Sequence, residues 1–262
     1  MDQDELAALK KWFTGYYHSF FTPRREDQRN HIIKYEHTLE VCRNALRIAR
    51  DLGLDERGLL LAEAIALFHD VGRFPQYQRY RTFDDSVSVN HAALSAKVLV
   101  ENNVLGRLDR RDRDLIVRAV TLHNVFSLPG GLDDETLLFA RIIRDADKLD
   151  ILRVVIEYFT QEEGSRAEAV ALGLPDRPSY SNDVLACLKR GEMARKDMLT
   201  TRNDFKLLQL AWLYDLNFVS SLRMVRERDY IRLIGGLLPQ DDDISGAIEL
   251  VKGYVEQRVR GE

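Results

Sequence analysis

The chain has 262 residues, with 38 Lys and Arg, 42 Asp and Glu, and a formal net charge of −4. This length is enough to bury a substantial core without disulfides. The acidic balance gives no overall attraction for a long polyanion, because nucleic-acid binding needs many phosphates to be neutralised by basic side chains. We therefore expect no nucleic-acid polymer as a partner.

The two cysteines, Cys42 and Cys187, each lie in an apolar helical pattern. This pattern predicts small buried residues in a reducing compartment. The amino terminus has no basic flank before an apolar run, and no window of about 18 apolar residues occurs, so we expect neither a secretory signal peptide nor a membrane span. The expected location is the cytoplasm, without a membrane partner.

Apolar residues recur at three- and four-residue spacing almost throughout, which predicts an all-helical protein. The expected helices, with ends uncertain by about two to four residues, are 4–20, 27–52, 56–69, 89–103, 110–123, 134–161, 182–198, 203–226 and 242–258. Several should begin after a short oxygen-bearing side chain that accepts from the first free amides, namely Asp55, Ser88, Asp109, Asp133 and Ser181.

Two proline-containing stretches, Gly72 to Val87 and Gly164 to Tyr180, look irregular. The second suggests a boundary, so we expect a helical bundle at residues 1–163 and a carboxy-terminal helical extension at 164–262, packed on the bundle. In that extension, three aromatic residues sit among leucines at helical spacing: Trp212, Tyr214 and Phe218. They suit packing within the chain or a subunit interface, so a homo-oligomer is one possible assembly.

The adjacent pair His69-Asp70 is the most informative feature, because its imidazole and carboxylate can both reach one divalent cation at the end of a helix. Four more candidate ligands lie on other predicted helices: His37, His91, His123 and Asp147. The apolar stripes around these residues direct them inward. A carboxylate on such a stripe must be paired, hydrogen-bonded or metal-bound to offset desolvation. The six residues together predict a buried metal centre with two ions.

A single inward histidine is more often a hydrogen-bonded core residue than a ligand. The joint burial of four imidazoles and two carboxylates favours the metal centre over that alternative. His18 and His31 do not join the set, since His31 lies six residues before His37 and therefore about 240° around the helix. Surface or local roles suit both.

The order His37, His69-Asp70, Asp147 resembles the HD superfamily of metal-dependent phosphohydrolases over roughly residues 28–160. The doublet stands inside Ala-Leu-Phe-His-Asp-Val-Gly-Arg, and the last aspartate inside Asp-Ala-Asp-Lys-Leu-Asp. The resemblance implies an HD-domain helical bundle in which His37, His69, Asp70 and Asp147 hold the first metal.

His91 and His123 extend the pattern to one that resembles the two-metal branch, which includes cyclic-dinucleotide phosphodiesterases and di-iron oxygenases. In that branch Asp70 would bridge the ions. Arg73 stands where lysine is common after the doublet, and Asn124 follows His123 where cyclic-di-GMP-specific members have His-Glu. These departures weaken an assignment to cyclic-di-GMP.

We expect hydrolysis of a small phosphate ester, a nucleotide or related compound, by metal-activated water. Asp70 would bridge and orient the nucleophile, and Arg73 would offer a forked donor to phosphate oxygens. Further phosphate-binding candidates are Arg79, Arg81 and Lys148. Asp145 and Asp150 could orient ligands or lie on a helix surface.

All proposed ligands are nitrogen or oxygen donors, which indicates divalent Mn, Fe, Co, Ni or catalytic Zn. Three alternatives stay open: a cyclic-dinucleotide phosphodiesterase, a di-iron oxygenase and a catalytically silent HD-fold binding module. The desolvation of six polar groups argues against the silent binding module, because such a module would gain nothing from it.

Overall fold

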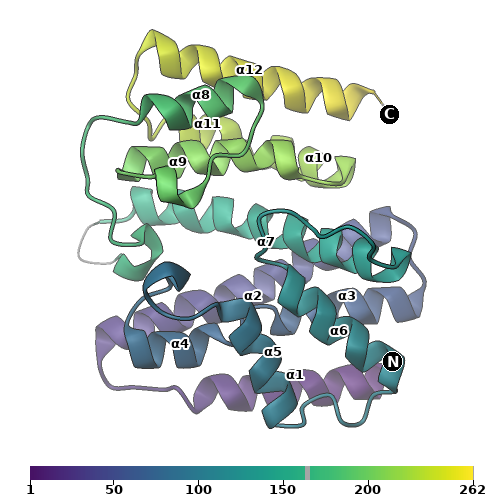
Figure 1. Cartoon of the computed structure of the whole chain (residues 1–262). Helices are drawn as coiled ribbons and strands as arrows, with labels where there is room; N and C mark the ends of the chain where they lie inside the picture. The colour runs from purple at the N-terminus through teal and green to yellow at the C-terminus, as the bar shows by residue number, and fades with distance from the viewer. Residues whose placement is uncertain (163–165, 262) are drawn as a thin grey trace. The chain divides into compact units, whose positions relative to one another are not determined.

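Figure 1 shows the computed structural model of the chain, which describes residues 1–162 and 166–261. Helices and their connections make up these ranges, and no strand occurs within them. The all-helical prediction is confirmed. The chain divides into two compact units, Met1–Asp150 and Ile151–Glu262. The boundary expected between 163 and 164 falls on residues outside the described ranges and stays a prediction.

The first unit is built from six helices and the part of a seventh up to Asp150: α1 (Gln3–His18), α2 (Arg25–Asp51), α3 (Glu56–Phe68), α4 (Arg73–Tyr80), α5 (His91–Glu101), α6 (Arg110–Leu122) and α7 (Asp134–Thr160). Within it α3 packs against α1, α2 and α6, and α5 packs against α4 and α6. The chain thus folds back repeatedly around α3, whose end carries the His-Asp doublet.

The core of this unit is formed by the apolar stripes that the helical spacing predicted. Fully buried members are Val41, Ala45, Ile48, Leu61, Ile65, Phe68, Ile116, Ala119, Val120, Ala140 and Ile143. Aromatic residues of α1 close one side, with the Phe13 ring 6.4 Å from Phe68 and 6.1 Å from Phe74 between centroids. This packing fixes the last turn of α3 in the interior.

Gly72 lets α5 approach the doublet closely. A Cβ at Gly72 would lie 2.6 Å from the backbone nitrogen of Ser95 and 2.7 Å from the carbonyl oxygen of His91. The Gly72 amide donates to Ser95 Oγ at 2.9 Å. Only a residue without a side chain permits this contact, which brings the first turn of α5 next to Asp70.

The segment from Gly72 to Val87, predicted to be irregular, contains α4 and the short 3-10 helix η1 (Asp85–Val87). That prediction was wrong because Pro75 falls in the first turn of α4, where the missing N–H has no helical partner to lose.

Three of the predicted caps are confirmed: Asp55, Asp109 and Asp133 accept from amides in the first turns of α3, α6 and α7. Asn90, not Ser88, caps α5, because the Asn90 side chain accepts from the amide of Ala93. Ser181 precedes α8 without a side-chain cap bond, since its hydroxyl donates to Asp204 instead.

The second unit contains the end of α7 with α8 (Asn182–Arg190), α9 (Arg202–Ala211), α10 (Val219–Glu227), α11 (Tyr230–Gly235) and α12 (Asp242–Arg260). Here α12 packs against α8, α10 and α11, and α9 packs against α8 and α11. Between residues 166 and 180 it holds the short 3-10 helix η3 (Glu168–Ala171).

Two expected helices of this unit were too long. The first stops at Gly191, which adopts φ 73° and whose amide donates to Leu188, a common left-handed helix end. The expected helix 203–226 is interrupted by the 3-10 helix η5 (Trp212–Asp215) and an extended Leu216. The apolar spacing did not predict this break, because buried leucines occur on both sides of it and within it.

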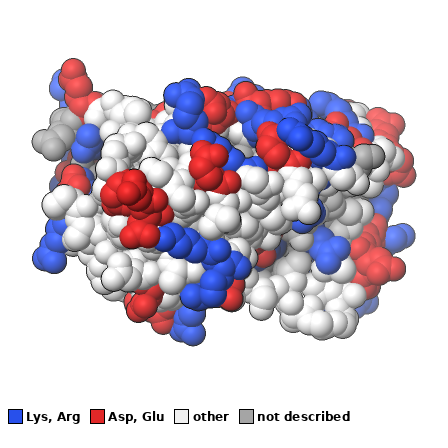
Figure 2. Space-filling model, turned by 90° about the horizontal axis from the view of Figure 1, so that it is seen from above, with Lys and Arg blue, Asp and Glu red and all other residues white. Residues whose placement is uncertain are grey.

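Tyr214 stacks edge-on against Tyr254 of α12, 4.7 Å between ring centroids, and Trp212 and Phe218 are half-buried. A subunit interface at these residues stays a prediction. Cys42 and Cys187 are free and buried, as expected. Figure 2 shows acidic and basic side chains lying beside one another on the face it presents. None of the helices in the described ranges has the length and apolar character needed to cross a membrane.

Candidate metal centre

The doublet lies where α3 ends. His69 is the residue that follows the last helical position and keeps right-handed helical angles. Its Nδ1 faces the carbonyl oxygen of Ala66, one turn back, at 2.7 Å, and its side chain is fully buried. This local bond fixes the ring so that Nε2 points away from α3, toward the neighbouring helices.

His37 approaches His69 from α2. Its Nε2 lies 3.3 Å from Nε2 of His69 and 3.1 Å from Oδ1 of Asp147 in α7. On the other side of the ring, Nδ1 donates to Oδ2 of Asp150 at 2.7 Å. Asp150 therefore orients His37, one of the two roles expected for it, and Asp147 completes this half of the cluster.

His91 and His123 form a second half. His91 is the first residue of α5, and His123 follows the last residue of α6. Their Nε2 atoms lie 2.9 Å apart. Nδ1 of His91 donates to Oδ2 of Asp85 at 2.6 Å, and Nδ1 of His123 donates to the carbonyl of Val120 at 2.7 Å.

Asp70 lies between the two halves, with one carboxylate oxygen toward each. Its Oδ2 is 3.6 Å from Nε2 of His37 and 3.7 Å from Nε2 of His69. Its Oδ1 is 3.4 Å from Nε2 of His91 and 3.8 Å from Nε2 of His123. This Oδ1 atom is buried without a hydrogen-bond partner, which indicates that a ligand belongs beside it.

The hydrogen bonds of the four histidines determine which ring nitrogen is protonated. Carbonyl and ionised carboxylate oxygens only accept, so each Nδ1 carries the proton. A neutral ring then presents a bare lone pair at Nε2. When the four rings are neutral, two such lone pairs face each other within each half, at 3.3 or 2.9 Å. A cation that bonds to both removes this repulsion, so the residues fit a divalent metal.

The protonation states support the same conclusion. Burial by itself would raise the pKa of Asp70, but Lys34 and the other basic groups around it hold that pKa well below its ordinary value. Burial likewise opposes ionisation of Asp147, while the rings of His37 and His69, whose Nε2 atoms lie 3.1 and 3.6 Å from its Oδ1, keep its pKa low. Both carboxylates are therefore ionised and able to act as ligands.

The pKa of His37 shifts in the opposite direction from the pKa values of His91 and His123. Burial lowers the pKa of His123 to about 3, and burial together with Arg73 lowers that of His91. Burial and Lys34 also oppose protonation of His37, but hydrogen bonds to Asp147 and Asp150 outweigh them and raise its pKa. A proton and a metal ion compete for the same lone pair, so protonation of His37 would oppose metal binding in this half of the cluster.

The side chains that could share a cation form three overlapping groups: His37, His69 and Asp70; His69, His123 and Asp147; and Asp70, His91 and His123. In each group the ligand atoms lie within 4.8 Å of one another. The structure thus brings together all six residues that the sequence singled out. His31, buried near Phe20 and hydrogen-bonded to its carbonyl, stays apart, as expected, but is not at the surface.

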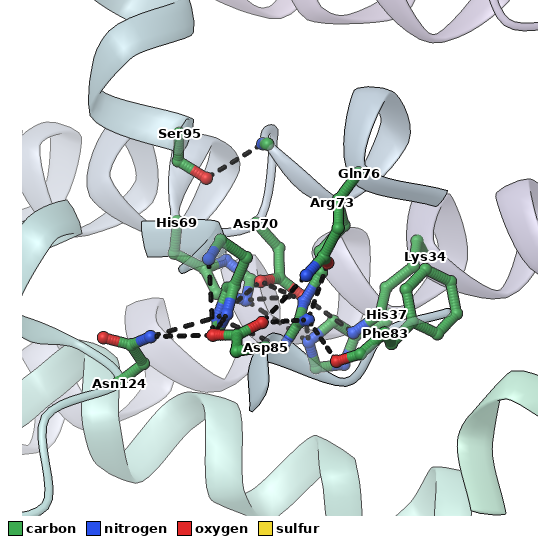
Figure 3. A network of polar contacts seen from close by, with 12 residues as sticks. Lys34, His37, His69, Asp70, Arg73, Gln76, Phe83, Asp85, Ser95 and Asn124 are labelled. Atoms are coloured by element: carbon green, nitrogen blue, oxygen red, sulfur yellow. Dashed lines mark hydrogen bonds and ion pairs between the residues drawn. The ribbon is translucent and has the colours of Figure 1, made fainter. Parts of the chain in front are cut away.

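Asp85 was missed by the sequence analysis. Its Oδ2 accepts from His91, and its Oδ1 accepts from Arg73 Nη1 at 3.0 Å and from Gln76 Nε2 at 2.9 Å (Figure 3). Burial opposes its ionisation, but the hydrogen bond with His91 and the nearby positive charge hold its pKa far below the ordinary value. Asp85 begins the short 3-10 helix η1, where no apolar stripe marks it in the sequence.

Arg73 lies beside the cluster, but its Nη1 is already engaged by three acceptors. Nη1 donates to Gln76 Oε1 at 2.8 Å, to the Phe83 carbonyl at 2.6 Å and to Asp85. Nε faces Asp70 Oδ1 at 3.4 Å, and Nη2 faces Nε2 of His91 at 3.3 Å. Arg73 therefore fastens the segment after α4 to the doublet, and its phosphate-binding role stays a prediction.

Lys34 is a second residue that the sequence analysis missed. Its Nζ donates to Asp70 Oδ2 at 2.8 Å and lies 5.1 Å from the centre of the Phe83 ring. It precedes His37 by three residues and so shares its face of α2. This spacing was a usable signal, but lysines on amphipathic helices are usually solvated.

Of the other phosphate-binding candidates, Arg79 and Arg81 lie away from the cluster, whereas Lys148 directly follows Asp147. Arg79 is exposed and stacks on Tyr80, 5.1 Å from the ring centre, and Arg81 pairs with Asp27 at 2.6 Å. Lys148 and Asp145 are buried in α7. In the part of the chain that the structure describes, Arg79 and Arg81 contact none of the six clustered residues.

Comparison with protein families gives the domain type. Residues 35–152 match the family model of the HD domain, and all six clustered residues lie inside the match. The matched range covers less than half of the chain and excludes α8 to α12. Searches of curated proteins and of solved structures found no match. The chain thus carries an HD domain, the domain type of a metal-dependent phosphohydrolase superfamily, with additional helices after it.

Proposed function

We propose that the HD domain hydrolyses a small phosphate ester, a nucleotide or related compound, with the help of two divalent cations. The observation that supports this most directly is the convergence of four imidazole Nε2 atoms on the two oxygens of one buried carboxylate, Asp70. Nitrogen and oxygen donors without thiolate suit Mn, Fe, Co, Ni or catalytic Zn.

The residues divide between the two cations. His37, His69, Asp70 and Asp147 would hold the first, and Asp70, His91 and His123 the second. Asp70 would bridge them, because its two oxygens are directed to different halves. Asp85 and Asp150 keep the rings of His91 and His37 oriented.

When bound, a divalent cation lowers the pKa of a coordinated water and polarises phosphoryl oxygens. The low pKa values of Asp70 and Asp147 keep these carboxylates ionised, and the low pKa values of His91 and His123 keep these rings neutral. All four are therefore in the protonation state that binds a metal. Burial keeps bulk water from His69 and His123. Asp147 retains 16% exposure, so a substrate can approach the cluster from its side.

The test combines metal analysis with a substrate panel. Protein purified without chelator is analysed for bound metal and assayed with nucleotides, cyclic dinucleotides, sugar phosphates and p-nitrophenyl phosphate, in the presence of Mn, Fe, Co, Ni or Zn. We expect bound metal and phosphate release from small esters. Both should disappear in the variant His69→Ala/Asp70→Ala, and retention of both by that variant would remove the proposal.

The same samples separate the alternatives. Cleavage confined to cyclic dinucleotides would indicate a phosphodiesterase of that type. Oxygen consumption with a visible iron absorption band would indicate dioxygen chemistry, whereas phosphate release under anaerobic conditions indicates hydrolysis. Absence of stoichiometric metal would favour a silent binding module.

A further inference from the structure

Lys34 is a cation held at the edge of the cluster by two contacts. Its Nζ donates to Asp70 Oδ2 and lies over the ring of Phe83, 5.1 Å from the ring centre. The lysine side chain is 16% exposed, whereas Asp70 is 3% exposed. Lys34 therefore extends from the buried carboxylate toward solvent.

The ammonium group of Lys34 still has donors to offer. A lysine Nζ carries three N–H groups. Among the described residues, Asp70 accepts one of these hydrogens, and the Phe83 ring provides only an electrostatic contact. Two N–H groups remain for an oxygen that arrives from solvent, and the flexible stem lets them follow it.

Arg73 is in the opposite situation. Its Nη1 donates to Gln76, Phe83 and Asp85, and its Nε and Nη2 face Asp70 and His91. A substrate oxygen could recruit Nη1 only by breaking bonds that hold the segment after α4, and Nε, which has no hydrogen-bond partner, is buried beside Asp70. Its contacts suit a positioning residue better than a substrate-binding one.

We propose that Lys34, rather than Arg73, binds the phosphoryl group of the substrate, by donating Nζ–H to a non-bridging oxygen. This inference rests on the proposed function, since it names the substrate-binding cation of the same site. Arg73 then acts through other residues, by keeping Asp85 and Asp70 in place.

The test uses the metal-loaded full chain and inorganic phosphate as the probe. Lys34→Met keeps the apolar stem and removes the charge, and Lys34→Arg keeps the charge. We expect Lys34→Met to weaken phosphate binding, measured by calorimetry, and to raise KM for p-nitrophenyl phosphate, each roughly 10- to 100-fold, the usual loss of a charged hydrogen bond. Lys34→Arg should restore part of both.

A matched control is Lys97→Met in α5, whose side chain is 62% exposed and, among the described residues, pairs with Glu101. It should bind phosphate like the wild type. Circular dichroism verifies the fold of each variant, and Lys34→Gln replaces Lys34→Met if the latter does not fold.

Measuring the metal affinity distinguishes two roles for Lys34, binding of the substrate and neutralisation of the Asp70 charge. If Lys34 only neutralises Asp70, Lys34→Met should bind metal more tightly and phosphate unchanged, and this result would overturn the inference. A wild type that binds no phosphate would overturn it as well. Lys34-dependent phosphate binding without hydrolysis of any ester would support Lys34 as the anion-binding residue and count against the proposed function alone.

Discussion

The Nδ1–H of His91 is donated to Asp85, 2.6 Å away, and the other oxygen of Asp85 accepts from Arg73 and Gln76 of α4. One carboxylate thus links a candidate metal ligand to the helix that follows the His-Asp doublet. His37 has an equivalent partner in Asp150. Each half of the cluster therefore contains one histidine backed by a carboxylate and one backed by a main-chain carbonyl.

Replacing Asp85 by Asn should weaken the half of the centre that contains His91 and His123. Asparagine can still accept from the ring, but the anion that makes Nε2 a stronger donor to metal is lost. Removal of such a partner typically costs about 10- to 100-fold in metal affinity. Titration with metal buffers, followed by metal analysis, measures the effect.

Asp150→Asn is the matched variant and should weaken the half that contains His37 and His69. If Asp85→Asn binds both cations as tightly as the wild type, Asp85 does not orient a ligand.

Replacing Gly72 by Ala should destabilise the first unit by about 1–3 kcal/mol, the usual cost of overpacking. The added Cβ would press on backbone atoms of Ser95 and His91, so α5 must shift and carry His91 with it. Chemical denaturation measures the stability, and metal binding reports the displacement of His91.

Gly15→Ala in α1 is the control, because a Cβ there meets nothing within 4 Å. A helix interior gains roughly 0.5–1 kcal/mol from this change. Equal effects of the two substitutions would show that the contact at Gly72 is not tight.

The stability of the metal-free protein should fall as pH decreases from about 6.5 toward about 3, in part because of His123. Burial lowers the pKa of this ring to about 3 in the folded chain, whereas an unfolded histidine has a pKa of about 6.5. Between these values the unfolded state binds more protons, so the free energy of unfolding falls on acidification. Denaturation of the chelator-treated wild type and His123→Gln at several pH values tests this, and the variant should show a shallower decrease. Parallel pH profiles would contradict the assignment to His123.

Metal removal should lower the thermal stability of the first unit. A ligand at 100 times its Kd that binds only the folded state stabilises it by about 2.7 kcal/mol. Calorimetry with and without chelator should therefore show an earlier transition for the stripped protein, and added Mn or Zn should reverse the shift. The variant His69→Ala/Asp70→Ala should not respond to either treatment. A chelator-independent transition in the wild type would argue against a resident metal.

The convergence of the six clustered residues could be predicted because each lies on, or at the end of, a helix with a regular apolar stripe. Once the stripes are buried, a residue such as His37 or Asp147 must point inward. The partners of these residues were harder to predict. Asp85 is six residues before His91 in a segment without periodicity, and only the folded backbone brings its carboxylate to the ring.

Arg73 illustrates a different limit. Its place after the doublet suggested a free forked donor, but sequence position does not show which acceptors compete for a guanidinium. The carbonyl of Phe83 and the side chains of Gln76 and Asp85 take its Nη1 hydrogens. Lys34 was passed over for the converse reason, since a lysine on a helix is usually solvated.

The helices themselves were predicted best where a cap and a long stripe coincide, as in α3 and α6. They were missed where two local signals conflict. Pro75 suggested a break but lies in the first turn of α4, and the leucines around Trp212 suggested continuity where the helix ends. Whether a proline starts or breaks a helix, and where an α-helix changes to a 3-10 helix, depend on backbone geometry. The spacing of apolar residues carries no information on this geometry.

His69 and His123 each follow the last residue of their helix, and each donates Nδ1–H to a carbonyl three residues earlier, in Ala66 and Val120. The hydrogen bond to Nδ1 of each ring is thus made within four consecutive residues. The last turn of such a helix holds an imidazole through its own backbone. A protein designer could therefore graft this turn onto another helical bundle without adding a carboxylate to hold the ring.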